Sequence, residues 1–206
     1  MEIAVIGAGR VGSTLGARLA FAGHQVHYAR RNPSEPAPDP LRHERSTTGS
    51  ARDVVGRSEA VLLATPWAKT EEALASVGDF GGRPLLDATN PIGPGFALTH
   101  GHDDSGAEQV QRWAPTSRVA KVFNTTGLEN MANPQYAFGR AVMLACGDDD
   151  DVRELAVRLA KDVGFDAKPF GPLASARLLE PMALVWIKLA MSYGMGREFA
   201  FGMLHR

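Results

Sequence analysis

The stretch that decides the fold reads EIAVIGAGRVG and spans residues 2–12. Residues 2–6 form a short apolar run rich in β-branched side chains, which predicts a strand buried on both faces of a parallel sheet. The G-x-G-x-x-G motif of residues 7–12 follows, and apolar residues then recur every four positions, as in a helix packed on that sheet. A glycine turn between a strand and a helix predicts a site for the pyrophosphate of a dinucleotide.

Each glycine of this turn has a mechanical role. Gly7 permits the tight turn, Gly9 lets a pyrophosphate approach the backbone, and Gly12 lets the helix press on the strand. The helix N-terminus supplies amide donors and partial positive charge for the phosphates. We therefore predict that the cofactor contacts the whole loop, which consists of Gly7, Ala8, Gly9, Arg10, Val11 and Gly12.

The end of the second strand, residues 25–29, distinguishes the two nicotinamide dinucleotides. An acidic residue at this point would bind the ribose 2′-hydroxyl of NAD, but the chain offers Arg30 and Arg31 instead. Two guanidinium groups match a 2′-phosphate through charge-assisted bonds. We therefore predict that NADP(H) is the cofactor and that both arginines bind it. The alternative is that the two arginines belong to a solvated loop.

Strands and helices alternate through most of the remaining chain. Short apolar runs predict strands at residues 60–64, 84–88, 119–123, 142–146 and 165–169, and helical spacing lies between them. This order predicts an α/β protein of the Rossmann type, with a doubly wound, mostly parallel sheet. Residues 32–50 contain several prolines and no clear period, so we expect them to be irregular. The apolar tail, residues 174–204, is expected to be helical.

Composition narrows the class of protein further. The 206 residues suffice for one core, with residues 1–170 as the nucleotide-binding domain and residues 171–206 as a segment that completes the substrate pocket and a subunit interface. The net charge of −1 argues against nonspecific binding of nucleic acid or an anionic membrane. A single cysteine, Cys146, no apolar run long enough for a bilayer and no signal peptide favour a cytoplasmic protein.

Three strand ends carry residues that could meet the cofactor or a second reactant. Ligands of open α/β sheets lie outside the carboxyl ends of the strands. Thr65, Pro66 and Trp67 should pass under the middle of the cofactor, and Asn90 should reach toward its nicotinamide half. The residues 124–127 follow a third strand end. Asn, Thr and Pro are also ordinary turn residues, which is the alternative interpretation of each segment taken alone.

At these residues the chain resembles a known family, the NADPH-dependent reductases of coenzyme F420. The resemblance covers essentially the whole sequence. It is carried by residues 7–12, 28–31, 64–66, 87–91 and 105–108, by VFNTTG at 122–127 with Asn130 and Asn133-Pro134, and by GPLASARLLEP at 171–181.

The resemblance implies a small homodimeric enzyme that passes hydride between NADP(H) and a deazaflavin co-substrate, coenzyme F420. It also implies that the deazaflavin stacks in a pocket bounded by the later strand ends and the C-terminal segment. The matching positions are Asn124, Thr125, Thr126, Pro172 and Leu173. Hydride transfer between two bound rings requires close stacking rather than a nucleophile or a metal, so we predict no dedicated catalytic residue, with Asn124 and Thr125 as the nearest candidates.

Other functions stay open at the level of the sequence. His100 and His102 could suggest a metal site, but no further Cys or His follows at ligand spacing, so we interpret them as part of a polar loop and predict no metal. The protein could instead be an NADPH-dependent reductase of a flavin or a small organic molecule. It could also be a non-catalytic NADP-sensing module whose tail docks a partner.

Overall fold

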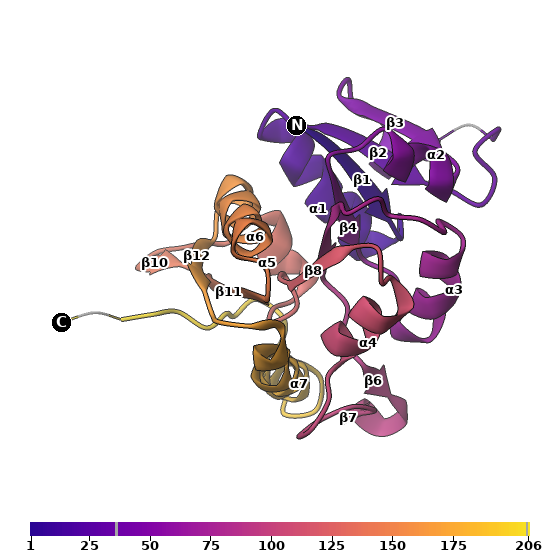
Figure 1. Ribbon diagram of the computed structural model, residues 1–206. Helices are drawn as coiled ribbons and strands as arrows, with labels where there is room; N and C mark the ends of the chain where they lie inside the picture. Colours follow the sequence, from indigo (N-terminus) through magenta and orange to yellow (C-terminus); the bar gives the residue numbers. More distant parts are fainter. Residues whose placement is uncertain (36, 205) are drawn as a thin grey trace.

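The computed structural model describes residues 1–35, 37–204 and 206. Within this part of the chain, eight strands form one sheet in the order β12-β11-β8-β5-β4-β1-β2-β3 (Figure 1). The strands from β3 to β8 in this order are parallel, whereas β11 pairs antiparallel with β8. Their bounds are β1 Glu2–Ile6, β2 Gln25–Ala29, β3 Ser46–Gly49, β4 Ala60–Leu63, β5 Pro84–Asp87, β8 Arg118–Lys121, β11 Val142–Gly147 and β12 Asp166–Pro169. The prediction of a mostly parallel Rossmann-type sheet is confirmed.

Helices cover both faces of the sheet, and each face has its own apolar cluster. One layer contains α1 Arg10–Phe21, α5 Leu128–Ala132 and α6 Asp150–Val163; the other contains α2 Ala51–Gly56, α3 Thr70–Ala75, α4 Gly106–Trp113 and α7 Ala176–Met191. The first cluster includes Leu15 and Leu159, and the second includes Leu74 and Leu179. Because strands such as β1 alternate their side chains between the two clusters, both faces of the sheet are buried.

Short elements connect this framework. Two small hairpins consist of β6 Ile92–Gly93 with β7 Ala97–Leu98, and β9 Gln135–Tyr136 with β10 Gly139–Arg140. Four single 3₁₀ turns among the described residues are η1 Asp39–Leu41, η2 Trp67–Lys69, η3 Pro94–Phe96 and η4 Leu173–Ser175. None of the helices within the described residues combines the length and apolarity that crossing a bilayer requires.

The expectation of an irregular segment before residue 50 is wrong for β3. This strand has the polar sequence STTG, and it pairs in parallel with β2, with Thr47 opposite His27. A strand at the edge of a sheet needs backbone pairing on one side only, so it forms without an apolar pattern that the sequence could have revealed.

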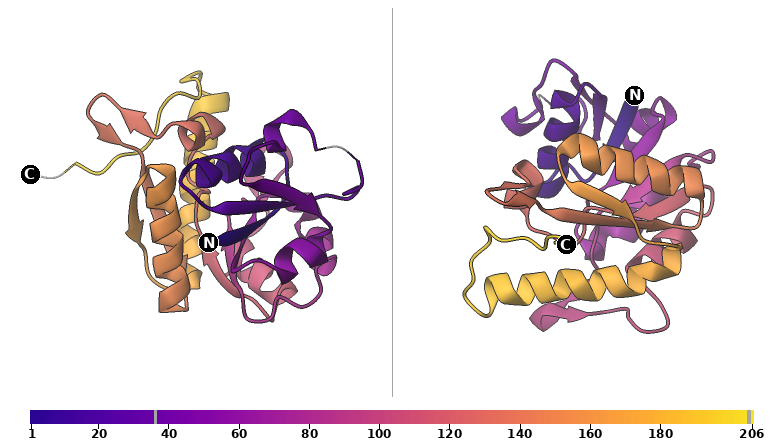
Figure 2. Two further views of the ribbon diagram at one scale, coloured as in Figure 1. Left: turned by 90° about the horizontal axis from the view of Figure 1, so that it is seen from above. Right: turned by 90° about the vertical axis from the view of Figure 1, so that its left-hand side faces the viewer.

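The expectation of a helix throughout residues 174–204 is wrong for its second half. The helix α7 ends at Met191, and Gly194 and Gly196 both have a φ of 72°, in the left-handed region that interrupts a helix. The chain then crosses the molecule as a strap, residues 197–204. The backbone oxygen of Phe199 accepts hydrogen bonds from Trp186 Nε1 at 2.9 Å and Asn130 Nδ2 at 2.7 Å. Figure 2 shows this segment leaving α7 and running back past the sheet.

Candidate cofactor and reactant site

The glycine turn after β1 has no room for side chains at two of its three glycines. Gly7 has a φ of 99°, and a Cβ at this position would lie 2.6 Å from the carbonyl group of Ala64, the residue directly after β4. A Cβ at Gly12 would collide with the carbonyl oxygen of Gly7. A Cβ at Gly9 would instead meet nothing within 4 Å. The open side of Gly9 is therefore the place where a phosphate could approach the backbone, which fits the roles predicted for the three residues.

The N-terminus of α1 is suited to an anion. Gly9 is its N-cap, no side chain caps the first turn, and that turn contains no acidic residue. The first amide groups of the helix are thus left without side-chain acceptors, and the helix dipole favours negative charge beside them. Arg10 and Val11 belong to this turn, and the side chain of Arg10 is exposed.

A cavity of about 810 Å³ extends from the glycine turn over the ends of β1, β2 and β4. Gly7 and Ala8 lie at one part of its wall, and Arg30 and Arg31 lie at another. Thr65 and Pro66 contribute the wall that follows β4. The cavity therefore brings together half of the predicted cofactor residues. Those that do not line it are Gly9, Arg10, Val11, Gly12, Trp67 and Asn90.

The two predicted arginines differ in their surroundings. Arg30 is folded back onto Glu35: its Nη1 donates to the backbone oxygen at 2.6 Å, and its Nη2 lies 3.8 Å from the carboxylate. Its side chain is only 15% exposed. Arg31 is exposed, and its positive charge helps to lower the pKa of Glu72 across the cavity. Of the two, Arg31 is the residue whose guanidinium is more accessible to a ligand.

Two further cations in the cavity wall were missed by sequence reasoning. Arg52 lies on α2, and Lys69 lies in η2 opposite the arginines. Lys69 Nζ is 3.1 Å from a carboxylate oxygen of Glu72, and this hydrogen bond, followed by the charges of Lys69 and Arg31, lowers the pKa of Glu72. The signal in the sequence was a lysine at the start of the helix that follows the β4 end. The cavity wall thus has four cations and two carboxylates, Glu35 and Glu72.

Trp67 does not line the cavity. Its ring packs against Trp113 with a centroid separation of 5.1 Å and meets His100 edge-on at 5.4 Å. Trp67 therefore joins η2 to α4, and its aromatic ring is occupied by packing within the chain.

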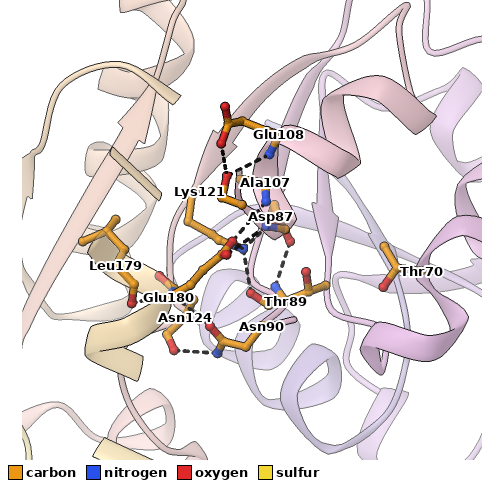
Figure 3. Close-up of polar contacts among 12 residues, drawn as sticks. Thr70, Asp87, Thr89, Asn90, Ala107, Glu108, Lys121, Asn124, Leu179 and Glu180 are labelled. Carbon is orange, nitrogen blue, oxygen red and sulfur yellow. Dashed lines mark hydrogen bonds and ion pairs between the residues drawn. The ribbon is translucent and has the colours of Figure 1, made fainter. Parts of the chain in front are cut away.

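Beyond β4, the ends of β5 and β8 meet in a fully buried cluster of charges (Figure 3). Lys121 Nζ lies 2.7 Å from a carboxylate oxygen of Asp87 and 2.9 Å from one of Glu180, and none of the three side chains is more than 1% exposed. Lys121 Nζ also donates to the backbone oxygen of Thr89 at 2.7 Å. Burial by itself would lower the pKa of Lys121, but the two carboxylates outweigh burial and hold this pKa above its ordinary value. Lys121 is therefore a buried ammonium group.

This cluster was also missed by sequence reasoning. The available signal was a charged residue at the end of each of two neighbouring apolar strands, Asp87 on β5 and Lys121 on β8, which are register partners in the sheet. Glu180 lies on α7, 59 residues beyond Lys121 in the chain, so no local pattern connects them.

Asn90 and Asn124 form a reciprocal pair beside the buried charges. Asn90 Nδ2 donates to the backbone oxygen of Asn124 at 2.9 Å, and Asn124 Nδ2 donates to Asn90 Oδ1 at 3.1 Å. Asn124 Nδ2 also donates to the backbone oxygen of Leu179 on α7 at 3.2 Å. The sequence analysis placed the two asparagines at successive strand ends, and the structure brings their side chains into contact. Asn90 is half-buried, but Asn124 and Thr125 are each only 2% exposed, so their side chains support the strand end from within.

Pro172 and Leu173 do not join the loop that starts at Asn124. Because β11 runs antiparallel to β8, with Cys146 opposite Lys121 and Gly147 opposite Ala120, the chain that leaves β11 heads toward the amino end of β8. Leu173 lies beside that end, where its amide donates to Asp148 Oδ1 at 2.9 Å. The loop from Asn124 leaves the other end of β8. The reversal of β11 and β12, which the sequence pattern did not reveal, therefore separates two segments that were expected to bound one pocket.

Comparison with known proteins agrees with this geometry. A family model described as NADP oxidoreductase, coenzyme F420-dependent, matches residues 2–91. The crystal structure of a candidate F420-dependent NADP reductase from Arthrobacter sp. FB24 has a TM-score of 0.89 and 31% identity, with 100% of each chain covered. A hypothetical protein from Sinorhizobium meliloti has a TM-score of 0.79 and 25% identity, covering 100% of this chain and 96% of that one.

A curated relative is similar over a smaller share of its length. The metalloreductase STEAP3 of Rattus norvegicus is 27% identical over 185 residues, which is 89% of this chain and 36% of the relative. This chain thus spans about a third of that protein. The fold and the glycine-turn site define a Rossmann-type NADP-dependent oxidoreductase class. Within that class, the chain belongs to the family of coenzyme F420-dependent NADP oxidoreductases.

Proposed function

We propose that this protein transfers a hydride between NADP(H) and the deazaflavin coenzyme F420. The observation that carries the proposal is the cavity that joins the glycine turn to Arg30 and Arg31, because it matches a pyrophosphate at one point and a 2′-phosphate at another. Membership of the family supports F420 as the second reactant. In the forward direction, NADPH, oxidised F420 and a proton give NADP⁺ and reduced F420.

The segments that bind the cofactor follow the ends of β1, β2 and β4. The turn from Gly7 to Gly12 holds the pyrophosphate through the open face of Gly9 and the first amides of α1. Thr65 and Pro66 lie under the middle of the cofactor, and Arg31 and Arg30 bind the 2′-phosphate with the aid of Lys69 in the same cavity. The excess of cations over carboxylates in this wall favours the phosphorylated dinucleotide over NAD.

The nicotinamide half belongs over the ends of β5 and β8. A dinucleotide in a doubly wound sheet lies across the carboxyl ends of the strands. The cavity of about 810 Å³, called here the adenosine cavity, lies on the β1–β2 side of the sheet and would take the adenosine half. Asn90, the half-buried member of the asparagine pair, follows the end of β5, and Thr126 follows the end of β8. When bound, NADPH supplies the hydride that the deazaflavin accepts at carbon 5. The chain contributes orientation and exclusion of water, which are the main requirements of this reaction.

We also propose that a second copy of the chain covers the end of the strap. Phe138 at the tip of the β9–β10 hairpin is fully exposed, and Leu204 is 94% exposed. A cavity of about 790 Å³ lies between the hairpin and residues 200–204. In Figure 1 both segments project from the same side of the molecule. Apolar segments that extend away from their own core need a covering surface, and a two-fold pair would let each hairpin meet the strap of its partner.

The test of the main proposal is a stopped-flow experiment with purified protein, NADPH and oxidised F420. We expect the visible absorbance of the deazaflavin to fall with one NADPH consumed per F420. Parallel reactions replace F420 with free flavin, with a ferric chelate or with no acceptor. They distinguish F420 reduction from the other reductase functions. Tight NADPH binding without turnover in any reaction would instead favour an NADP-sensing module, and faster reduction of flavin or ferric chelate than of F420 would replace the proposed acceptor.

A further inference from the structure

We propose that Lys121 is a positioning residue for hydride transfer. Together with Asp87 and Glu180, it holds the Asn90–Asn124 pair in place beside the nicotinamide and makes that placement depend on how α7 docks. The inference rests on the proposed function, because it assigns the nicotinamide half to the ends of β5 and β8.

The contacts run without a break from the buried charges to the asparagines. Lys121 Nζ binds the Asp87 carboxylate and the backbone oxygen of Thr89, both at 2.7 Å. The other carboxylate oxygen of Asp87 accepts from the amide of Thr89 at 2.8 Å. The two ends of the turn that precedes Asn90 are thus held by one ion pair. Asn90 then exchanges hydrogen bonds with Asn124, as Figure 3 shows.

The backbone between Lys121 and Asn124 is constrained in the same way. Phe123 is completely buried and has a φ of 65°, a conformation that costs a bulky residue free energy. Lys121 lies two residues before it, and the Asn124 side chain, one residue after it, is held by Asn90 and Leu179. The strained turn aims Asn124 back across the end of β5. Such strain persists only where the surrounding contacts determine the backbone, and the buried charges provide part of those contacts.

The helix α7 enters the arrangement through two adjacent residues. The backbone oxygen of Leu179 accepts from Asn124, and the carboxylate of Glu180 binds Lys121. Glu180 also accepts from the amides of Gly106 at 2.8 Å and Ala107 at 3.0 Å, at the start of α4. A displacement of α7 would therefore pull on the ammonium group and on Asn124 together.

Stability alone is a weak reason for such a cluster. The desolvation of two carboxylates and one ammonium group is expensive, and apolar or neutral replacements of buried ion pairs are often as stable as the originals. A buried ionic cluster restricts the surrounding backbone and side chains to one arrangement, because each charged group must keep its particular hydrogen-bond and ion-pair partners. A cluster placed directly under the expected nicotinamide site would hold the residues beside the nicotinamide in the positions that hydride transfer requires.

The adenosine cavity lies on the other side of β4 and shares no residue with this cluster. Disturbing the cluster should therefore alter hydride transfer much more than NADPH affinity. This difference between the two measurements separates positioning from a general loss of structure.

The experiment uses the full chain and a neutral replacement, Asp87→Asn/Lys121→Met/Glu180→Gln, which removes all three charges at similar volume. The matched control is Lys168→Met, because Lys168 forms a surface ion pair with Asp166 at 2.8 Å, on β12. For each protein we would measure the NADPH dissociation constant, the fluorescence anisotropy of the bound reduced nicotinamide, single-turnover reduction of F420 with its isotope effect from deuterated NADPH, and urea unfolding.

For the neutral replacement we expect a folded protein whose hydride transfer at saturating NADPH is about 10- to 100-fold slower. We also expect a larger isotope effect, lower nicotinamide anisotropy and a dissociation constant for NADPH within about threefold of the original. The control should match the original protein. If the neutral replacement folds and keeps both the transfer rate and the anisotropy, the inference is overturned.

If the neutral replacement does not fold, the single variant Glu180→Gln tests the inference instead, since it leaves the ion pair of Lys121 with Asp87 in place. A slower transfer with retained NADPH affinity supports positioning, and failure of this variant to fold as well identifies the cluster as purely structural and overturns the inference. The anisotropy needs no acceptor. If the original protein does not reduce F420, the proposed function fails, while the nicotinamide signal still tests the role of Lys121.

Discussion

Lys121 and Asp87 are register partners on neighbouring parallel strands, and their charged groups lie 2.7 Å apart with no exposure to solvent. The third partner, Glu180, comes from the C-terminal helix α7. The same residues therefore connect the central sheet to α7 at the ends of β5 and β8.

Removal of the ammonium group alone should be strongly destabilising. In Lys121→Met the carboxylates of Asp87 and Glu180 would remain buried without their counter-charge, and breaking a buried pair in this way costs about 3–5 kcal/mol. The control Lys168→Met breaks an exposed pair and should change the free energy of unfolding by about 1 kcal/mol or less. Urea unfolding of both variants measures the difference, and equal effects would contradict the expected role of burial.

The glycine turn offers a pair of variants that separates folding from binding. Gly9→Ala adds a methyl group that meets nothing within 4 Å, so the protein should keep its stability but bind NADPH more weakly, because the methyl group occupies the approach of the pyrophosphate. Gly12→Ala should lower both stability and binding, since its Cβ collides with the Gly7 carbonyl oxygen. Calorimetric titration with NADPH and urea unfolding distinguish the two. Wild-type affinity in Gly9→Ala would refute the assignment of the turn.

Cofactor selectivity should depend on Arg31 and on Lys69. Removing one charge-assisted contact to the 2′-phosphate should weaken NADPH binding by about 10-fold in either alanine variant and leave NADH binding nearly unchanged. Glu72→Gln should have the opposite effect, because it removes a carboxylate that pairs with Lys69 at 3.1 Å. Dissociation constants for both dinucleotides provide the test. An alanine variant at both Arg30 and Arg31 that still prefers NADPH would rule out the proposed phosphate site.

Alkaline pH should destabilise the protein because two buried groups resist ionisation. Burial raises the pKa of Tyr28 from 10.0 to about 12 and that of the Cys146 thiol from 9.0 to about 12. Since the folded-state pKa values are the higher ones, this stabilisation is fully present below about pH 9 and is lost as the pH rises toward 12. Tyr28→Phe should reduce the slope of stability against pH by up to about 1.4 kcal/mol per pH unit above pH 10. Urea unfolding between about pH 8 and 11 would show this; an unchanged slope would be evidence against burial as the cause.

The proposed pairing of two copies depends on exposed apolar residues at the hairpin and strap. Phe138→Asp should shift the protein toward the monomer. It should not affect the fold, because the Phe138 side chain is fully exposed in the single chain. Phe21→Asp is a matched control, since Phe21 is also an exposed aromatic residue but ends α1 and belongs to neither the hairpin nor the strap. Sedimentation at two protein concentrations measures the mass. A monomer in the original protein, or a dimer that tolerates Phe138→Asp, would exclude this surface as the interface.

Local patterns were sufficient for the nucleotide-binding half of the fold except for its edge strand β3. The strand at residues 2–6, the glycine turn and the helix after it can each be recognised from residues that are close together in the sequence. The basic residues can likewise be recognised by their position directly after β2. The cavity then brings Gly7, Ala8, Arg30, Arg31, Thr65 and Pro66 together, as the rule for strand ends predicts. The strand β3 was missed because its polar residues are held by backbone pairing with β2.

The sequence by itself determined the Rossmann-type framework and the dinucleotide-binding character of its glycine turn, because these depend on periodicity, on glycine sterics and on short spacings. Only the tertiary structure decided the reversal of β11 and β12, the end of α7 at Met191 and the meeting of Glu180 with Lys121. Those features depend on contacts between residues far apart in the chain. Their free energies arise from pairing and burial that no local window of sequence contains.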